Sequence, residues 1–179
     1  MDRELRTERL RLRGWTAADR APFAALNADP KVMEHFPALL SRHESDTLAE
    51  RIEAHIVEHG WGLWAVEASG VTAFAGYVGL ARVSFPAPFT PAIEVSWKLA
   101  AEFWGRGYAT EAATAALSFG FQSLMLREIV SFTVPANLRS LAVMQRIGMT
   151  RDPQGDFEHP RLPEGHCLRR HVLFRKSRD

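Results

Sequence analysis

The feature that most constrains this chain is a glycine-rich loop at residues 104–110, placed between a strand-like run at 94–99 and an alanine-rich, helix-like run. Backbone N–H groups at a helix start lack intrahelical partners, and the helix dipole adds partial positive charge there. Such a loop is an anion site that suits a pyrophosphate. Gly105 and Gly107 let the backbone approach phosphate without a Cβ in the way, and Arg106 adds a full positive charge.

Two general phosphate-loop patterns fit this loop poorly. A P-loop requires Gly-Lys-Ser or Gly-Lys-Thr, and the sequence contains neither. A dinucleotide fingerprint is matched by Gly105 and Gly107, but Thr110 occupies the third glycine position. Glu128 lies at a suitable distance for the ribose-binding acid, yet it precedes the expected strand at 129–134 instead of ending it. An NAD(P)-binding oxidoreductase therefore remains only as an alternative interpretation.

The segment Trp104-Gly-Arg-Gly-Tyr-Ala-Thr-Glu-Ala resembles the acetyl-coenzyme A loop of the GNAT superfamily, in which Gln or Arg commonly stands where this chain has Trp104. The Trp form resembles the branch of Rim-type ribosomal-protein N-acetyltransferases. Residues 7–13, 29–33 and 137–149 resemble the first strand, the segment after the first helix and the second cofactor-binding helix of that branch. These elements occur in the family's order from about residue 7 to 175.

The hydrophobic pattern and the turn signals predict an α+β fold. Period-two alternation or apolar runs favour strands at 9–13, 61–68, 73–81, 92–99, 128–134 and 171–174. Capping residues and helical spacing favour helices at 16–27, 41–60, 109–122 and 137–147. The proline-rich stretch at 85–91 is expected to be a loop. The resemblance implies one domain over residues 1–179, with a core of about 7–175 and a mixed sheet of about six or seven strands that splays to hold the cofactor.

Composition narrows the functional classes. The 179 residues suit one domain, with 46% apolar and 24% charged residues. A formal net charge of +1 argues against a dedicated nucleic-acid binder. No signal peptide and no membrane span is visible in the sequence, so we expect a cytoplasmic protein with no membrane partner. Cys167 is the single cysteine, which excludes an intrachain disulfide.

The resemblance assigns the cofactor contacts. It implies that the acetyl-CoA pantetheine arm lies in a gap between the strands at 92–99 and 128–134, and that the phosphates lie on the glycine loop. The residues expected to bind the cofactor are Trp97, Lys98, Leu99, Trp104, Gly105, Arg106, Gly107, Tyr108, Ala109, Thr110, Asn137 and Ser140. Asn137 is also expected to cap its helix.

The catalytic residues expected are Glu94 and Ser140. Glu94 shares one strand face with Ser96 and Lys98, and strand direction makes it the acid best placed to remove the proton of an acceptor amine. Ser140 is a candidate donor of a proton to the departing thiolate. Many GNAT enzymes carry a tyrosine general acid four residues further on, but this chain has Met144 there, which favours protonation by water.

We therefore expect an acetyl-CoA-dependent N-acetyltransferase that transfers the acetyl group directly to a primary amine, either a protein N-terminus or a small molecule. The alternative from another class is a non-catalytic CoA-binding sensor or scaffold. Rim-type relatives suggest a homodimer. No metal is expected, because His159, His166, Cys167 and His171 fit no standard zinc spacing. These residues are expected to shape the acceptor pocket, and the aromatic residues near Phe85 and Phe89 hint at an apolar acceptor site.

Overall fold

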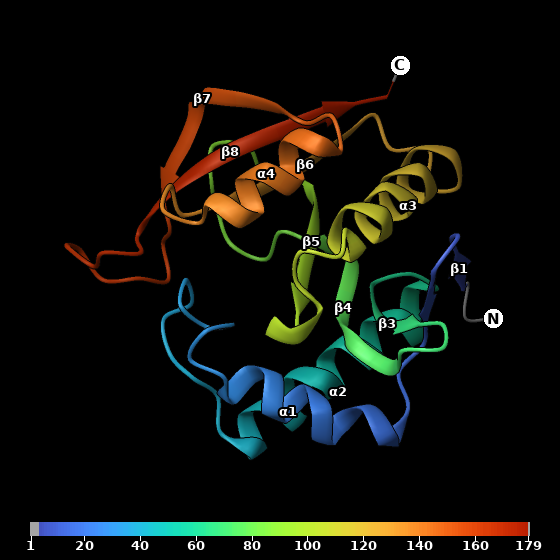
Figure 1. Ribbon diagram of the computed structural model, residues 1–179. Coiled ribbons are helices and arrows are strands. Elements are labelled where there is room, and N and C mark those ends of the chain that lie inside the picture. Colours follow the sequence, from blue (N-terminus) through green and yellow to red (C-terminus); the bar gives the residue numbers. More distant parts are fainter. Residues whose placement is uncertain (1–3, 179) are drawn as a thin grey trace.

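A mixed sheet of eight strands organises residues 4–178, the part of the chain that the computed structural model describes (Figure 1). The strand order is β1-β2-β3-β4-β5-β6-β8-β7. The β5–β6 pair is parallel and every other neighbouring pair is antiparallel. The strands are β1 Leu5–Arg6, β2 Leu10–Arg13, β3 Leu63–Ala68, β4 Thr72–Arg82, β5 Ile93–Leu99, β6 Glu128–Thr133, β7 Thr150–Glu158 and β8 Arg170–Ser177.

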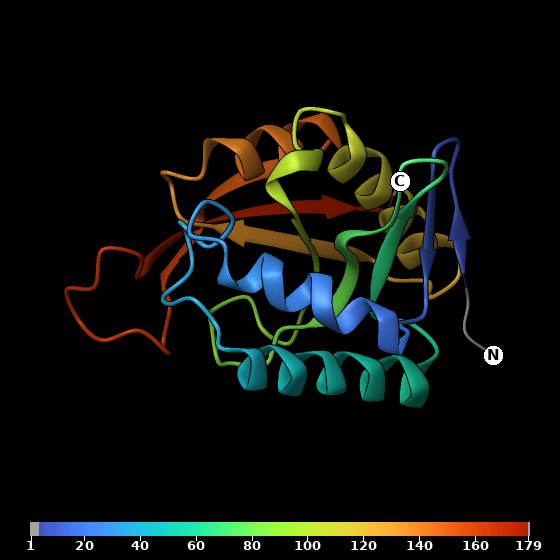
Figure 2. The same cartoon turned by 60° about the horizontal axis from the view of Figure 1, so that its bottom comes forward.

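Four α-helices cover the sheet in the described residues, two on each face (Figure 2). Helices α1 and α2 run side by side across one face, and α3 and α4 cover the other. The helices are α1 Arg20–Ala28, α2 Arg42–His59, α3 Tyr108–Gln122 and α4 Leu138–Arg146. The architecture is therefore the α+β arrangement that the sequence predicted.

The predicted helix ends are confirmed where local hydrogen bonds define them. Ser41 and Glu44 form a reciprocal capping box at the start of α2, and Gly60 ends the helix in the left-handed conformation at φ 73°. Thr16 and Asp19 form a second capping box. The turn after Thr16 is a 3₁₀ helix at Ala17–Asp19, so α1 itself begins at Arg20, later than predicted.

Strand β7 was not predicted, and with the short β1 it raises the strand number from the expected six or seven to eight. Its sequence contains Pro153 and Gly155, and its register with β8 shifts between Asp152 and Phe157. Proline and glycine are tolerated at a bulge on an edge strand but contradict the usual strand pattern. The final strand also extends further than the predicted 171–174.

Small residues allow α3 to lie close against the sheet. Ala112, Ala113 and Ala116 are fully buried, and a Cβ at Gly120 would lie 2.6 Å from Ile129 Cδ1 on β6 and 3.0 Å from Leu80 Cδ1 on β4. This packing fixes the N-terminus of α3 beside the ends of the central strands.

Strands β5 and β6 separate in the middle of the sheet. Their register contains one pair, Glu94 with Val130. Along the rest of β5, residues 95–99 pair only with β4 in the described chain. The resulting divergence is the splay that the family resemblance implied. Within residues 4–178, no helix combines the length and apolar character needed to cross a membrane.

Candidate active site

The glycine loop leads directly into α3 with both of its glycines in the left-handed conformation. Gly105 has φ 75°, and Gly107, the N-cap residue of α3, has φ 81°. Gly105, Arg106 and Gly107 are exposed, so the loop that precedes α3 lies at the surface. A Cβ at Gly107 would lie 3.3 Å from Arg9 Nη2. The loop therefore has the free donors and the lack of side-chain bulk that a phosphate group requires.

An ion pair distant in sequence holds this loop in place. The Arg9 guanidinium donates to the Arg106 carbonyl oxygen at 3.0 Å and pairs with Glu111 on α3 at 2.6 Å. Thr7 Oγ1 also donates to Glu111 at 2.6 Å. Burial acts to raise the pKa of Glu111, but these hydrogen bonds outweigh it and lower that pKa. Sequence reasoning did not identify Arg9 and Glu111 as partners.

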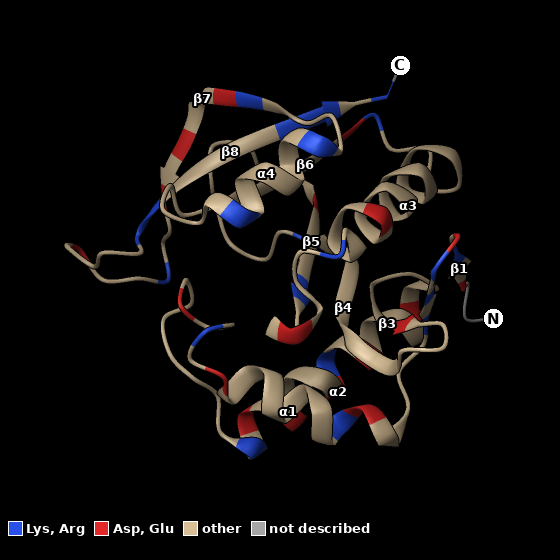
Figure 3. Ribbon diagram, viewed as in Figure 1, with Lys and Arg blue, Asp and Glu red and all other residues tan. Residues whose placement is uncertain are grey.

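Trp104 connects the loop to β5 and lies beneath two cations. Its indole Nε1 donates to the Leu99 carbonyl oxygen at 2.8 Å. The Arg139 guanidinium carbon lies 4.2 Å and Lys31 Nζ 5.5 Å from its ring centroid. Arg139 also pairs with Glu34 at 3.0 Å. Positive charge from α4 and from the segment after α1 therefore gathers next to the loop, although Lys and Arg are otherwise interspersed with Asp and Glu over the molecule (Figure 3).

Helix α4 begins with the cap that the sequence predicted. Asn137 Oδ1 accepts a hydrogen bond from Ser140 N at 3.2 Å, and Asn137 Nδ2 donates to Thr133 Oγ1 on β6 at 3.0 Å. Ser140 is half-buried. Met144 is 1% exposed and lies in the core, so the usual tyrosine position contributes no hydroxyl here.

Glu94 lies at the point where β5 and β6 part. Burial raises the pKa of its carboxyl group to about 7. Among the residues described, it has no ion-pair partner within 4.0 Å, so no cation opposes this shift. The Tyr77 pKa is raised by burial and then by the Glu94 charge, while a hydrogen bond with Ser96 acts in the opposite direction. Tyr77 and Ser96 are thus polar neighbours of Glu94 that sequence reasoning did not select.

The Lys98 side chain does not point along the gap between β5 and β6. Its Nζ donates to Asn27 Oδ1 on α1 at 3.0 Å and lies 4.2 Å from the Phe36 ring centroid. Asn27 Nδ2 in turn donates to Ser45 Oγ on α2 at 2.9 Å. Burial lowers the Lys98 pKa to about 8. The side chain is engaged in joining β5 to α1, which leaves only its main chain for the predicted cofactor contact.

The structure brings together several of the aromatic residues noted in the sequence. The His159 ring lies 4.5 Å from the Phe85 ring and 5.1 Å from the His171 ring. His166 does not join them, because its Nδ1 accepts a local hydrogen bond from Leu168 N at 3.1 Å, and Cys167 is exposed. No group of three or more His, Cys, Asp or Glu suited to a metal ion occurs in residues 4–178.

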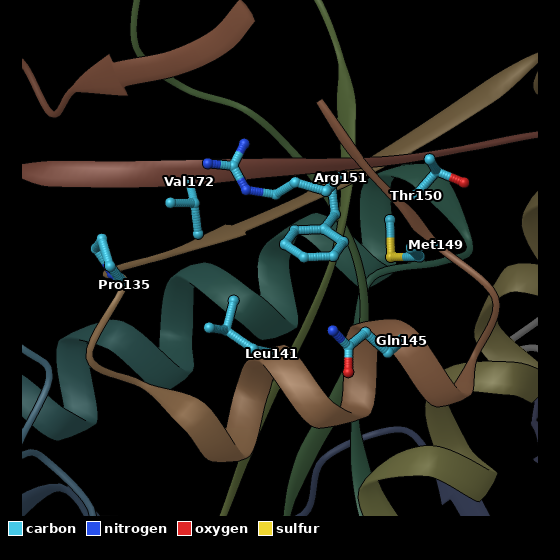
Figure 4. Close-up of a pocket in the computed structure, with 8 residues that line it drawn as sticks. Pro135, Leu141, Gln145, Met149, Thr150, Arg151 and Val172 are labelled. Carbon is cyan, nitrogen blue, oxygen red and sulfur yellow. The ribbon is translucent and has the colours of Figure 1, made fainter. Parts of the chain in front are cut away.

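A cavity of about 560 Å³ lies elsewhere, between α4 and the β7–β8 hairpin (Figure 4). It is lined by Pro135, Leu141, Gln145, Met149, Thr150, Arg151, Val172 and Phe174. None of these residues belongs to the predicted site. Glu94 and the glycine loop therefore lie outside this cavity.

Residues 9–150 match the family described as the acetyltransferase (GNAT) domain, which accounts for the parted strands and the glycine loop together. The chain belongs to the GNAT family. It is 30% identical to the uncharacterized protein YkkB of Bacillus subtilis, over 82% of this chain and 84% of that protein. It is 32% identical to the FsC-acetyl coenzyme A-N(2)-transacetylase of Aspergillus fumigatus, over 70% of this chain and 55% of that protein.

Solved GNAT structures share the whole fold. An acetyltransferase from Agrobacterium tumefaciens has a TM-score of 0.78 and 28% identity, covering 98% of this chain and 95% of that one. A ribosomal-protein-S5-alanine acetyltransferase from Vibrio fischeri has a TM-score of 0.76 and 18% identity, covering 99% and 98%. This GNAT protein is an N-acetyltransferase with a single mixed sheet, and its fold is similar to that of Rim-type enzymes.

Proposed function

We propose that this GNAT protein moves the acetyl group of acetyl-CoA directly to a primary amine, with Glu94 as the general base. The observation that carries the proposal is the position of Glu94. It is a carboxylate without a cation partner in the described chain, and it stands where β5 and β6 part. A pKa of about 7 suits a base that must be ionised at neutral pH and still accept a proton.

The residues around the gap fit the cofactor in chemical character. The N–H groups of residues 105–110 and the Arg106 charge suit a pyrophosphate. The free edge of β5 at residues 97–99 suits the amide groups of pantetheine, with Asn137 and Ser140 on the neighbouring helix α4. When bound, acetyl-CoA supplies an already activated thioester. Alignment of the amine with that carbonyl can itself lower the barrier by about 7 kcal/mol or more.

The proposed transfer needs no covalent enzyme intermediate. The amine nitrogen forms the new amide bond as the C–S bond breaks, and the amine proton passes to Glu94. CoA leaves as a thiolate, which takes a proton from water or from Ser140. Water is the favoured donor, because Met144 replaces the usual tyrosine and a serine hydroxyl is a weak acid. The proposal leaves the class of acceptor open, since one similar protein is named as a ribosomal-protein-S5-alanine acetyltransferase and another as an FsC-acetyl coenzyme A-N(2)-transacetylase.

The second candidate function is CoA binding without catalysis, which the absence of a tyrosine at Met144 favours. It predicts that the protein binds CoA but releases no thiol from acetyl-CoA with any amine. An NAD(P)-binding oxidoreductase predicts NAD binding without CoA binding.

Calorimetric titration with acetyl-CoA, CoA and NAD tests these functions. We expect micromolar binding of both CoA forms to the wild type, loss of binding in Gly107→Trp, and no NAD signal. Gly70→Trp is the matched control, because Gly70 also has a positive φ, of 70°, and lies in open space in the β3–β4 turn. Absence of CoA binding to the wild type, or equal binding to Gly107→Trp, would contradict the proposed cofactor site.

A further inference from the structure

Four phenylalanines from three segments meet outside the main core. Phe85 and Phe89 come from the loop between β4 and β5, Phe132 from β6 and Phe157 from β7. The Phe157 ring centroid lies 5.0 Å from that of Phe89, 5.4 Å from that of Phe132 and 5.8 Å from that of Phe85. Most of these rings meet at steep angles, the edge-to-face geometry that aromatic side chains prefer. We call these four residues, with His159 and His171, the aromatic cluster.

Strand register places the aromatic cluster on the same sheet face as Glu94. Glu94 pairs with Val130 in parallel, so Phe132, two residues beyond Val130, lies on the same sheet face as Glu94, past the point where the two strands part. Side chains two residues apart share a face, and the spacing along the strand is about 7 Å. Phe157 pairs with His171 on the next strands. An amine held at Glu94 therefore has Val130 opposite it on β6 and the aromatic cluster next along the same face.

The aromatic cluster is not part of the main hydrophobic core. None of its phenylalanines belongs to the continuous core that joins the helices to the central strands. Phe157 is 7% exposed, whereas Phe85, Phe89 and Phe132 are only half-buried. Rings that only filled the interior would be covered on all sides. These rings instead keep part of their surface available to a further group.

The two histidines of the aromatic cluster add little charge to it. Burial lowers the pKa of both His159 and His171, which favours the uncharged form of each imidazole. Arg161 is the cation at its rim, 5.6 Å from the Phe85 ring centroid, and it donates to the Ser84 carbonyl oxygen at 2.7 Å. This bond fixes the segment after β7 onto the β4–β5 loop. The wall that results is apolar, aromatic and held between two loops.

We propose that the aromatic cluster is the acceptor subsite, and that the preferred acceptors are primary amines with an aromatic ring a few bonds from the nitrogen. This inference rests on the proposed function. A ring seated against Phe132 and Phe89 leaves its amine beside Glu94, because the two sites share a sheet face about two residues apart. A small N-terminal side chain, such as that of alanine, would leave the rings uncovered.

Steady-state release of the CoA thiol tests the preference. The acceptors are 2-phenylethylamine, 2-cyclohexylethylamine, butylamine, and two peptides that differ only in an N-terminal Phe or Ala. We expect kcat/KM to be about tenfold or more higher for 2-phenylethylamine than for butylamine, and for the Phe peptide than for the Ala peptide. The cyclohexyl amine separates the aromatic contribution from size, and should fall between the two simple amines. Equal or reversed preferences would overturn the inference while leaving the acetyltransferase function intact.

Two variants locate the preference in the aromatic cluster. Phe132→Leu and Phe89→Leu keep an apolar side chain but remove a ring, and should reduce the phenylethylamine-to-butylamine ratio about fivefold, mainly through KM. Phe121→Leu, on α3, is the matched control and should leave the ratio unchanged. An unchanged ratio in both cluster variants would also overturn the inference.

If no amine is acetylated, the proposed function is contradicted. The subsite can then still be tested by a binding measurement. Saturation-transfer NMR with 2-phenylethylamine and wild-type protein should give a signal in the ring protons that weakens in Phe132→Leu but persists in Phe121→Leu. Absence of binding to the wild type, or equal binding to Phe132→Leu, would overturn the subsite itself.

Discussion

Glu94 is half-buried where β5 and β6 part and has no cation partner in the described chain, and desolvation raises its pKa to about 7. Only the ionised carboxylate accepts a proton, so kcat/KM is expected to increase as pH rises through about 7. Glu94→Gln should reduce kcat/KM about 100-fold at neutral pH and remove that inflection. Thiol release measured from pH 5.5 to 9 at subsaturating amine checks both effects.

The control is Glu58→Gln, on the exposed side of α2, which should retain both the rate and the inflection. A surviving inflection near pH 7 in Glu94→Gln would assign the titration to another group. His159 and His171, in the aromatic cluster, are the histidines to consider, but burial lowers the pKa of both, which moves their titration to more acidic pH.

At the residue scale, local contacts could be predicted and distant ones could not. The Asn137 cap was predictable because its hydrogen bond spans only three residues. The Arg9–Glu111 contact joins residues 102 positions apart, and the sequence contains no signal that pairs them. Tyr77 was missed for the same reason, since only the pairing of β4 with β5 brings it beside Glu94, whereas the sequence did place Ser96 on the same strand face as Glu94.

Among the elements, α1, α2 and β5 are joined by the buried contacts of Asn27 with Ser45 and Lys98. Asn27→Ala should lower the free energy of unfolding by about 2 kcal/mol, because it leaves the buried Lys98 ammonium with only the weak acceptor Met33 Sδ. Urea unfolding measures the loss. Val57→Ala, at an 81% exposed position on α2, should change stability by less than about 0.5 kcal/mol. Similar effects in the two variants would contradict the role given to Asn27.

The close pairing of β4 with β5 depends on Gly76. Its φ is 137°, and a Cβ there would meet the Lys98 carbonyl oxygen and lie 2.7 Å from Leu99 Cα. Gly76→Ala should therefore destabilise the fold by about 2–4 kcal/mol, since neither strand can move without losing ladder hydrogen bonds. Thermal unfolding checks this against Gly165→Ala, where φ is also positive at 79° but the space is open. If the two variants lose equal stability, the effect at Gly76 comes from its backbone conformation alone, and the predicted contact with β5 plays no part.

Elements with strong local signals were predicted well, and elements defined by pairing were not. Helix α2 has a capping box at one end and a glycine at the other, so its bounds followed from the sequence. Strand β7 contains Pro153 and Gly155 and alternates poorly, and it exists because β8 offers it an edge. Tertiary pairing overrode its weak strand propensity.

For the whole molecule, family resemblance supplied the sheet arrangement, which composition and periodicity alone do not encode. The single parallel contact between β5 and β6 creates the gap on which the proposed site depends. The aromatic cluster is assembled from four segments, so the sequence could only suggest that the residues near Phe85 and Phe89 were unusual. Its relation to Glu94 becomes visible only through the strand register.

The whole molecule also carries a half-buried carboxylate, Glu94, and a buried ammonium, Lys98, on one face of β5, and both should make its stability depend on pH. The Glu94 pKa is raised from 4.5 to about 7, so between those pH values the folded state binds more protons than the unfolded state, and stability falls as pH rises. The Lys98 pKa is lowered from 10.5 to about 8, so the unfolded state binds more protons there and stability rises as pH rises from 8 to 10.5. Together, these two residues should give their smallest contribution to the free energy of unfolding near pH 7–8.

The difference in unfolding free energy between a variant and the wild type, measured as a function of pH, isolates the contribution of each residue from that of the rest of the protein. The stability of Glu94→Gln relative to the wild type should rise between pH 4.5 and 7 and then level off, with a gain on the order of 2 kcal/mol once partial exposure is allowed for. Lys98→Met loses the hydrogen bond to Asn27 at every pH, so only the pH dependence of its stability difference from the wild type is informative. The stability of this variant relative to the wild type should fall between pH 8 and 10.5. Urea unfolding at closely spaced pH values measures both. A flat difference for Glu94→Gln would mean that its pKa is equal in the folded and unfolded states, which would also remove the physical basis for its role as a base near neutral pH.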